Sequence, residues 1–413
     1  MNATSTPQRV VIVGAGQAGG ETAAELRRQG FSGQISIVGD EPWFPYKRPP
    51  LSKAYLAGAA ARESLYVMSQ AALERASVEF HGGVAVRAID RVARSVVLVD
   101  GRSLEYDKLV LATGGRARRL DCPGAELPGV HVLRGIADVD AIRERMQADA
   151  RLVIVGGGYI GLEVAAVAVK AGLKVTVLES MPRVLQRVTA PEMSAFYERV
   201  HREAGVDLRT GVQLAGFEAQ ADGSLRVNLA GTGVLGADLV VVGIGIVPNV
   251  ELAADAGLTV DNGIVVDQYT RTSDPDIHAA GDCTSHPSAF FGRHIRLESV
   301  QNAMEQGRSV AHNLLGKATA YANVPWFWSD QYDLKLQMVG MSAGYDQCVL
   351  RGDPAQRSFS AFYLRDGVLI AVDAVSRPLE FMLAKKLVAA RARIEPARIA
   401  DESIPMKEIA AGF

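Results

Sequence analysis

Two glycine-rich turns contain the residues of this sequence that are best suited to chemistry. The first occupies positions 14–19 (GAGQAG) and the second positions 156–161 (GGGYIG), and both have glycine first, third and sixth. A pyrophosphate is bound by backbone N–H groups at a helix N-terminus, and glycine lets the chain turn sharply and approach the phosphates. Each turn is therefore predicted to bind one nucleotide. The residues are Gly14, Gly16 and Gly19 in the first turn, and Gly156, Gly158, Tyr159, Ile160 and Gly161 in the second.

The segments around both turns predict the elements that position them. A β-branched run at 10–13 leads into the first turn, an Ala/Glu/Leu-rich segment follows it, and a second apolar run covers 35–38. The same order recurs around the second turn, with apolar runs at 152–155 and 175–178. Strand, turn, helix and strand begin a nucleotide-binding sheet. A turn without a ligand is the alternative for a single match, but two matches in this context favour two nucleotides.

A carboxylate follows the second strand of each predicted unit. Asp40 and Glu179 would accept hydrogen bonds from ribose hydroxyls and would repel a 2′-phosphate, so the second turn favours NADH over NADPH. Arg183 keeps NADPH open, because it could contact a 2′-phosphate if Glu179 turned away. For either acid, a carboxylate that is merely solvated at a strand end is the alternative.

Composition limits the class of protein. The chain has 413 residues, of which 48% are hydrophobic and 22% charged, so two or three folded domains are expected. A formal net charge of −2 gives no support for binding nucleic acid or a membrane surface. The longest apolar run, 239–247, is too short to cross a bilayer, and the polar start of the chain does not resemble a secretory signal. We therefore expect a cytoplasmic protein.

Several further motifs extend the pattern over nearly the whole chain. They are RPPLSK at 48–53, LATGG at 111–115, AAGDC at 279–283 and PWFWSDQ at 325–331. Together with the second glycine turn, they resemble the flavoprotein reductases that bind two dinucleotides. The segments at 48–53 and 325–331 are similar to those of the oxygenase-coupled ferredoxin reductases, which serve bacterial haem-thiolate monooxygenases.

This resemblance implies the architecture of glutathione-reductase-like proteins. The fold class is α/β, with two Rossmann-like three-layer domains for FAD and NAD and a C-terminal α+β domain. The implied FAD-binding domain is discontinuous and covers 1–115 and 247–322. The implied NAD-binding domain covers 116–246 and the C-terminal domain 323–413.

The resemblance also assigns roles to individual residues. The FAD contacts that it implies are Ala18, Asp40, Lys53, Val86, Arg134, Asp282 and Val300. A positive charge on Lys53 would favour the electron-rich reduced flavin, and Glu163 would pair with this lysine close to the nicotinamide. Both are therefore expected to tune the reaction without acting as an obligatory acid or base. Trp326 would cover the nicotinamide pocket. A surface lysine and a core tryptophan are the alternatives for Lys53 and Trp326.

The implied activity is an NADH:ferredoxin oxidoreductase. Hydride would pass from NADH to FAD, and single electrons would pass to an acidic [2Fe-2S] ferredoxin that feeds the monooxygenase. Basic side chains would steer this transient partner, and the candidates are Arg308, Lys317 and Lys335, for which ordinary surface charge is the alternative.

Two other functions can be compared with this expectation. A disulfide reductase needs a cysteine pair near the flavin, but Cys122, Cys283 and Cys348 are far apart in sequence and form no CxxC motif. They indicate neither a disulfide framework nor a metal site, and the histidines have no metal-ligand spacing. The second alternative is a non-enzymatic flavoprotein that senses NADH or acts as a scaffold.

Overall fold

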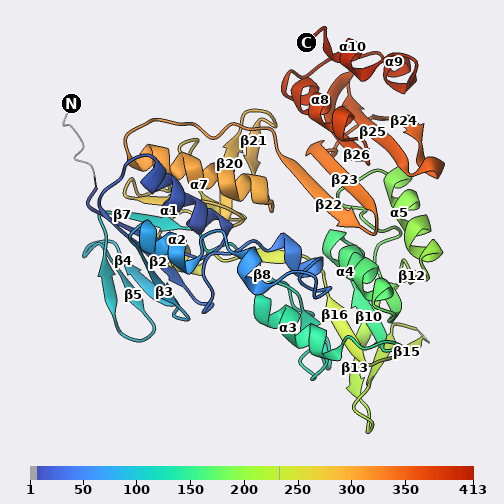
Figure 1. Ribbon diagram of the computed structural model, residues 1–413, viewed down its shortest axis with the longest axis horizontal. Helices are drawn as coiled ribbons and strands as arrows, with labels where there is room; N and C mark the ends of the chain where they lie inside the picture. The colour runs from blue at the N-terminus through green and yellow to red at the C-terminus, as the bar shows by residue number, and fades with distance from the viewer. Residues whose placement is uncertain (1–6, 232) are drawn as a thin grey trace. The chain divides into compact units, whose positions relative to one another are not determined.

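The computed structural model describes residues 7–231 and 233–413, which divide into two compact units (Figure 1). The first unit combines the chain up to Arg48 with Ala61–Arg116 and Val247–Asn323. The second unit combines Pro49–Ala60, Ala117–Ile246 and Val324–Phe413. Each unit is thus built from segments that are distant in sequence. Short strands β8 (Gly115–Ala117) and β17 (Ile246–Pro248) occur where the chain passes from one unit to the other.

A five-stranded parallel sheet forms the centre of the first unit. Its strand order is β3-β2-β1-β7-β19. The order reverses between β1 and β7, and nucleotides bind at the carboxyl ends of the strands beside such a reversal. The strands are β1 (Arg9–Val13), β2 (Gln34–Gly39), β3 (Val78–Gly82), β7 (Lys108–Leu111) and β19 (Ile277–Ala279).

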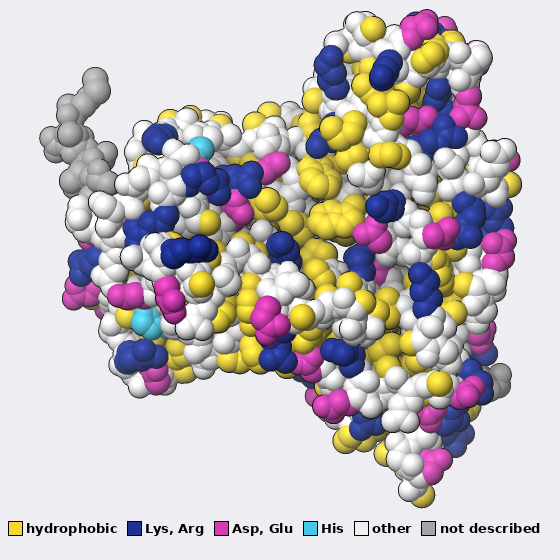
Figure 2. All heavy atoms as spheres, in the orientation of Figure 1, with side chains coloured by type: hydrophobic (Ala, Val, Ile, Leu, Met, Phe, Trp, Pro, Cys, Tyr) yellow, Lys and Arg dark blue, Asp and Glu magenta, His cyan; other side chains and the backbone are white. Residues whose placement is uncertain are grey.

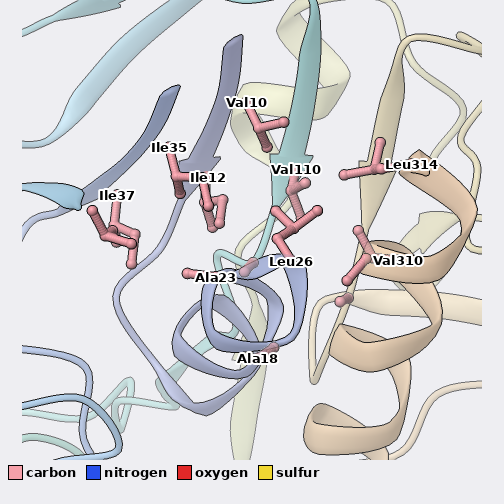
Figure 3. Packing of buried hydrophobic residues seen from close by; sticks show 14 of the residues in the cluster. Val10, Ile12, Ala18, Ala23, Leu26, Ile35, Ile37, Val110, Val310 and Leu314 are labelled. Carbon is pink, nitrogen blue, oxygen red and sulfur yellow. The ribbon is translucent and has the colours of Figure 1, made fainter. Parts of the chain in front are cut away.

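The two faces of this sheet bury different layers. Val10 and Ile12 of β1 pack with helices α1 (Gln17–Arg28) and α7 (Val300–Leu314), as Figure 3 shows. Val11 and Val13 point to the other face and pack with residues of an antiparallel meander. This is the two-residue alternation of a strand that is buried on both sides. The meander comprises β4 (Val86–Asp90), β5 (Ser95–Leu98) and β6 (Ser103–Glu105). Smaller elements are α2 (Gln70–Arg75), α6 (Glu251–Asp255), β18 (Ile264–Val265), β20 (Thr284–Ser288) and β21 (Arg293–Ile295).

The second unit contains a parallel sheet of the same kind, in the order β12-β11-β10-β16-β9. Val153 and Val155 of β10 pack against the meander β13–β15, so this sheet is also covered on one face by antiparallel strands. The sheet strands are β9 (Val130–Val132), β10 (Arg151–Val155), β11 (Lys174–Leu178), β12 (Asp207–Arg209) and β16 (Leu239–Val242). The remaining elements are β13 (Leu214–Ala219), β14 (Leu225–Leu229), β15 (Val234–Ala237), α3 (Ile136–Arg145), α4 (Tyr159–Lys170) and α5 (Pro191–Glu203).

An antiparallel sheet with helices completes the second unit, in the order β22-β23-β26-β25-β24. Asp366 and Gly367 both have positive φ, at 50° and 73°, and they join β25 to β26 in the hairpin that the Asp-Gly pair predicts. The strands are β22 (Trp326–Gln331), β23 (Leu334–Gly340), β24 (Gln347–Asp353), β25 (Ser358–Arg365) and β26 (Val368–Val375). The helices are α8 (Pro378–Ala389), α9 (Pro396–Ala400) and α10 (Met406–Ala410).

The predicted fold class is confirmed, since two Rossmann-like parallel sheets and a C-terminal α+β region are present. The contacts divide the chain into two units, and one of them contains both the predicted NAD-binding region and the C-terminal region. The boundaries of three separate domains therefore stay a prediction. Among the described residues, no helix has the length and apolarity needed to cross a bilayer.

Candidate functional site

The first glycine turn follows β1 and opens α1. Gly14 has a φ of +116°, and a Cβ at this position would lie 2.1 Å from the carbonyl oxygen of Ala112. A Cβ on Gly19 would lie 2.1 Å from the carbonyl oxygen of Gly14, so both glycines are required by close backbone packing. Gly16 differs, because nothing lies within 4 Å of its Cβ position. The helix N-terminus therefore faces open space where an anion can approach the backbone.

The second turn repeats this geometry. Gly156 has a φ of +113°, and its Cβ would lie 2.5 Å from the carbonyl oxygen of Gly243. A Cβ on Gly161 would lie 2.1 Å from the carbonyl oxygen of Gly156, whereas the Cβ position of Gly158 is open. In each turn the outer glycines allow the fold and the middle glycine leaves room for a ligand. Both turns thus fit the pyrophosphate of a dinucleotide.

The two predicted ribose acids have different surroundings. Asp40 is exposed after β2, and its Oδ1 accepts the N–H of Glu41 at 3.1 Å. Glu179 is half-buried after β11, where Oε2 accepts the N–H of Gly157 at 2.7 Å and Oε1 accepts the N–H of Met181 at 2.8 Å. Glu179 therefore fixes the second turn and also places a negative charge beside it.

Arg183 is held by its own segment. Its Nη1 donates to the carbonyl oxygen of Thr189 at 2.9 Å and to Oγ of Ser194 at 2.6 Å, and its Nη2 donates to the carbonyl oxygen of Gln186 at 3.2 Å. A guanidinium engaged in this way is not directed at a 2′-phosphate. This arrangement favours NADH, in agreement with the position of Glu179.

A buried ion pair lies next to the second turn. Lys53 Nζ is 2.6 Å from Oε2 of Glu163, whose side chain is only 1% exposed. Oε2 also accepts the hydroxyl of Ser52 at 2.5 Å, and Oε1 accepts the hydroxyl of Ser329 at 2.6 Å. A buried carboxylate needs such partners to remain charged. The structure thus brings together the two predicted tuning residues, which are separated by more than a hundred positions.

Aromatic side chains pack beside the second glycine turn. The ring centroids of Tyr159 and Phe327 are 5.2 Å apart, and the hydroxyl of Tyr159 donates to Sδ of Met338 at 2.8 Å. Burial, and next the charge of Asp373, raise the pKa of Tyr159 well above its usual value, so this phenol stays neutral. Ile160, next in the turn, is 40% exposed.

Trp326 has a cation above its ring. Lys385 Nζ lies 5.0 Å from the centroid of Trp326, which is half-buried, and the ring also contacts Phe381 at 6.0 Å. Figure 2 shows hydrophobic side chains gathered on the face that carries α8 and β22, where Leu379 and Met382 are more than half exposed. The placement of Trp326 over a nicotinamide stays a prediction.

The remaining predicted FAD residues lie at the ends of elements. In the first unit, Ala18 is buried in α1, Val86 is buried at the start of β4, Asp282 follows β19, and Val300 begins α7. Arg134 lies in the second unit, and its N–H donates to Oδ2 of Asp138 at 2.9 Å. Their contacts with FAD stay predictions.

An ion pair between Arg48 and Glu41, which the sequence analysis did not predict, lies near Asp282. Arg48 Nη2 lies 2.6 Å from Oε1 of Glu41. Burial opposes its charge, but Tyr46, Glu41 and Asp282 together raise the pKa of Arg48 above its ordinary value. The only sequence signal was its place at the start of the RPPLSK motif.

The three cysteines are free thiols. Burial raises the pKa of Cys283, and Sγ of this residue lies 3.4 Å from the carbonyl oxygen of Ala280. Burial likewise raises the pKa of Cys122, and it raises that of Cys348 to about 12. All three are therefore protonated near neutral pH and are poor nucleophiles. Among the residues that the structure describes, no group of His, Cys, Asp or Glu could hold a metal ion.

Two family models match the chain. Residues 8–307 match pyridine nucleotide-disulphide oxidoreductase, and residues 326–410 match the reductase C-terminal domain. The chain belongs to the pyridine nucleotide-disulphide oxidoreductase family. The duplicated glycine turns are the part of the fold that this family uses for its nucleotides.

Relatives within the family are similar over their full length. Putidaredoxin reductase of Pseudomonas putida is 51% identical over 97% of this chain and 96% of its own length. A ferredoxin–NAD(P)+ reductase of Sphingomonas sp. is 46% identical over 98% of each. A crystal structure of the covalent putidaredoxin reductase–putidaredoxin complex matches with a TM-score of 0.94 and 50% identity, covering all of this chain and 99% of that chain. The predicted resemblance to ferredoxin reductases is confirmed.

Proposed function

We propose that this protein is an FAD-containing, NADH-dependent ferredoxin reductase. The observation that carries the proposal is the pair of glycine turns with one geometry, each followed by a carboxylate, in a chain whose cysteines are protonated. Two nucleotide sites without a reactive thiol suit electron transfer and do not suit disulfide reduction. The ferredoxin partners in the names of the relatives agree with this function.

The cofactor supplies the redox chemistry and the chain supplies charge and orientation. When bound, FAD provides the conversion between two-electron transfer from NADH and one-electron transfer to an iron-sulfur centre. The backbone at Gly16 and Gly158 would hold the two pyrophosphates, with Asp40 and Glu179 on the riboses. The Lys53 ammonium, oriented by Glu163, would favour the reduced flavin.

The partner is an acidic [2Fe-2S] ferredoxin that serves a haem-thiolate monooxygenase. Of the candidate docking residues, Arg308 pairs with Glu21 at 2.6 Å, whereas Lys317 and Lys335 are both exposed. Lys317 also donates to the neutral amide of Gln29 at 2.6 Å. Lys317 and Lys335 therefore have charges that are available to a partner. We also propose a cytoplasmic location, which cell fractionation tests directly.

Stopped-flow spectroscopy tests the function. We expect NADH to bleach the flavin absorbance faster than NADPH does, and reduction of a one-electron acceptor to require an added [2Fe-2S] ferredoxin. Ferredoxin reduction should also weaken with added salt, whereas reduction of a small artificial acceptor should not. Slow bleaching without acceptor dependence would favour a non-enzymatic sensor or scaffold.

A further inference from the structure

A chain of hydrogen bonds leads away from the buried carboxylate of Glu163. Ser329 Oγ is 2.6 Å from Oε1 of Glu163, and Nε2 of Gln331 donates to this Oγ at 3.2 Å. His201 Nε2 lies 2.8 Å from Oε1 of Gln331, and the hydroxyl of Tyr332 lies 3.0 Å from Nδ1 of His201. These side chains come from α4, β22, α5 and the turn after β22, all in the second unit.

The chemistry of each group fixes the direction of the donors. An ionised carboxylate only accepts, so the hydroxyl of Ser329 donates to Glu163 and its oxygen accepts from the amide of Gln331. This turns the amide oxygen of Gln331 toward His201, whose Nε2 must then carry the proton. Nδ1 of His201 then carries no proton and accepts the hydroxyl of Tyr332. Every donor therefore points toward Glu163.

The state of His201 agrees with this assignment. His201 is fully buried, and burial lowers its pKa to about 4. The ring is therefore neutral near pH 7 and has one donor and one acceptor nitrogen, as the chain requires. Donors aligned in one direction polarise one another, which strengthens the last bond to the carboxylate.

The geometry of β22 makes the chain possible. Ser329 and Gln331 are two residues apart on this strand and so point to the same face, between Glu163 of α4 and His201 of α5. Both are buried, with at most 1% exposure. The C-terminal region thus contributes directly to the surroundings of the predicted flavin-tuning pair.

We propose that Ser329, Gln331 and His201 are positioning residues, which hold Glu163 and through it Lys53 in the orientation that flavin reduction needs. The proposal rests on the proposed function, in which this ion pair tunes the flavin. Gln331 cannot relay protons readily through its amide, so the role of the chain is orientation and charge stabilisation.

Single-turnover bleaching of the FAD-loaded enzyme by NADH tests the proposal. We expect Ser329→Ala to slow bleaching about tenfold, because it removes one hydrogen bond to Glu163. We expect His201→Leu to slow bleaching about threefold, because it only weakens this bond through Gln331 and Ser329. His201→Gln, which can place an N–H near Nε2, should recover most of the rate. In a Glu163→Gln background, His201→Leu should have no further effect.

Ser360→Ala provides a matched control. Ser360 is also a buried strand serine, and its hydroxyl donates to the buried Glu380 at 2.5 Å. This variant should lose as much thermal stability as Ser329→Ala and keep the wild-type bleaching rate. Equal slowing by Ser360→Ala, or equal slowing by His201→Leu in both backgrounds, would overturn the proposal. Wild-type enzyme that NADH does not bleach would instead overturn the proposed function, and this inference with it.

Discussion

Removal of one member of the Lys53–Glu163 pair is the most informative perturbation of this site. Lys53→Met keeps the volume of the side chain and removes the charge. Among the described residues, the buried carboxylate of Glu163 then keeps the hydroxyls of Ser52 and Ser329 as partners. Glu163→Gln removes the other charge, and the double variant removes both.

The structure gives different magnitudes for the three variants. Removing one partner of a buried ion pair costs about 3–5 kcal/mol in the free energy of unfolding. For Lys53→Met we expect about 3 kcal/mol, because two hydroxyl donors remain. For Glu163→Gln we expect about 2 kcal/mol, because the side chain of Lys53 is 19% exposed and can be solvated. The double variant leaves no unpaired charge, so it should lose roughly 2 kcal/mol less than the sum of the single variants.

Urea unfolding followed by tryptophan fluorescence measures these losses. Trp326 and Trp328 belong to the unit that contains the pair. The bleaching rate with NADH should fall in all three variants while FAD remains bound. If the losses of the single variants simply add in the double variant, the two charges do not stabilise each other and the reasoning fails.

Three further predictions concern other parts of the chain. Gly16→Ala should fold but lose FAD and be colourless, whereas Gly19→Ala should fail to fold, because its Cβ would lie 2.1 Å from the carbonyl oxygen of Gly14; the soluble yield and the flavin absorbance of both variants measure this difference. Burial raises the pKa of Asp373 in the folded protein to about 6. As pH rises from about 4 to 6, Asp373 loses its proton in the unfolded chain but keeps it in the folded protein, so the free energy of unfolding falls. Asp373→Asn should therefore be more stable than the wild type above pH 6, by roughly 3 kcal/mol, and equal to it below pH 4, which urea midpoints across this range would show. Arg183→Ala should leave the ratio of NADH to NADPH rates unchanged, since the guanidinium is engaged by its own segment; a clear fall in the NADPH rate would contradict this assignment.

The local features of the site could be predicted from the sequence. The glycine turns and their carboxylates depend on residues close together in the chain, because strand, turn and helix form one continuous segment. The Asp366–Gly367 hairpin is local for the same reason. These predictions needed no knowledge of tertiary contacts.

The supports of Glu163 could not be predicted in this way. Ser52 is 111 positions from Glu163 and Ser329 is 166 positions from it. The packing of the turn Pro49–Ser52 on α4 brings in Ser52, and the packing of β22 on α4 brings in Ser329. His201 has no distinguishing neighbours in the sequence, and only its contacts with Gln331 and Tyr332 mark it. The family resemblance alone predicts the pairing of Lys53 with Glu163. The structure places the two charged groups 2.6 Å apart, and their role beside the flavin stays a prediction.

The pairing of β19 with β7 also limits when the first sheet can be completed during synthesis. Ile277 pairs with Leu109, so the outer edge of β7 stays uncovered until the ribosome has added the residues up to Ala279. Such long-range pairing is slow, and an unpaired edge strand can associate with other chains. The segment between them, which includes β10, α4 and β11, emerges earlier and can collapse first. The sheet that carries the first glycine turn is therefore completed only after β10, α4 and β11 have been synthesised.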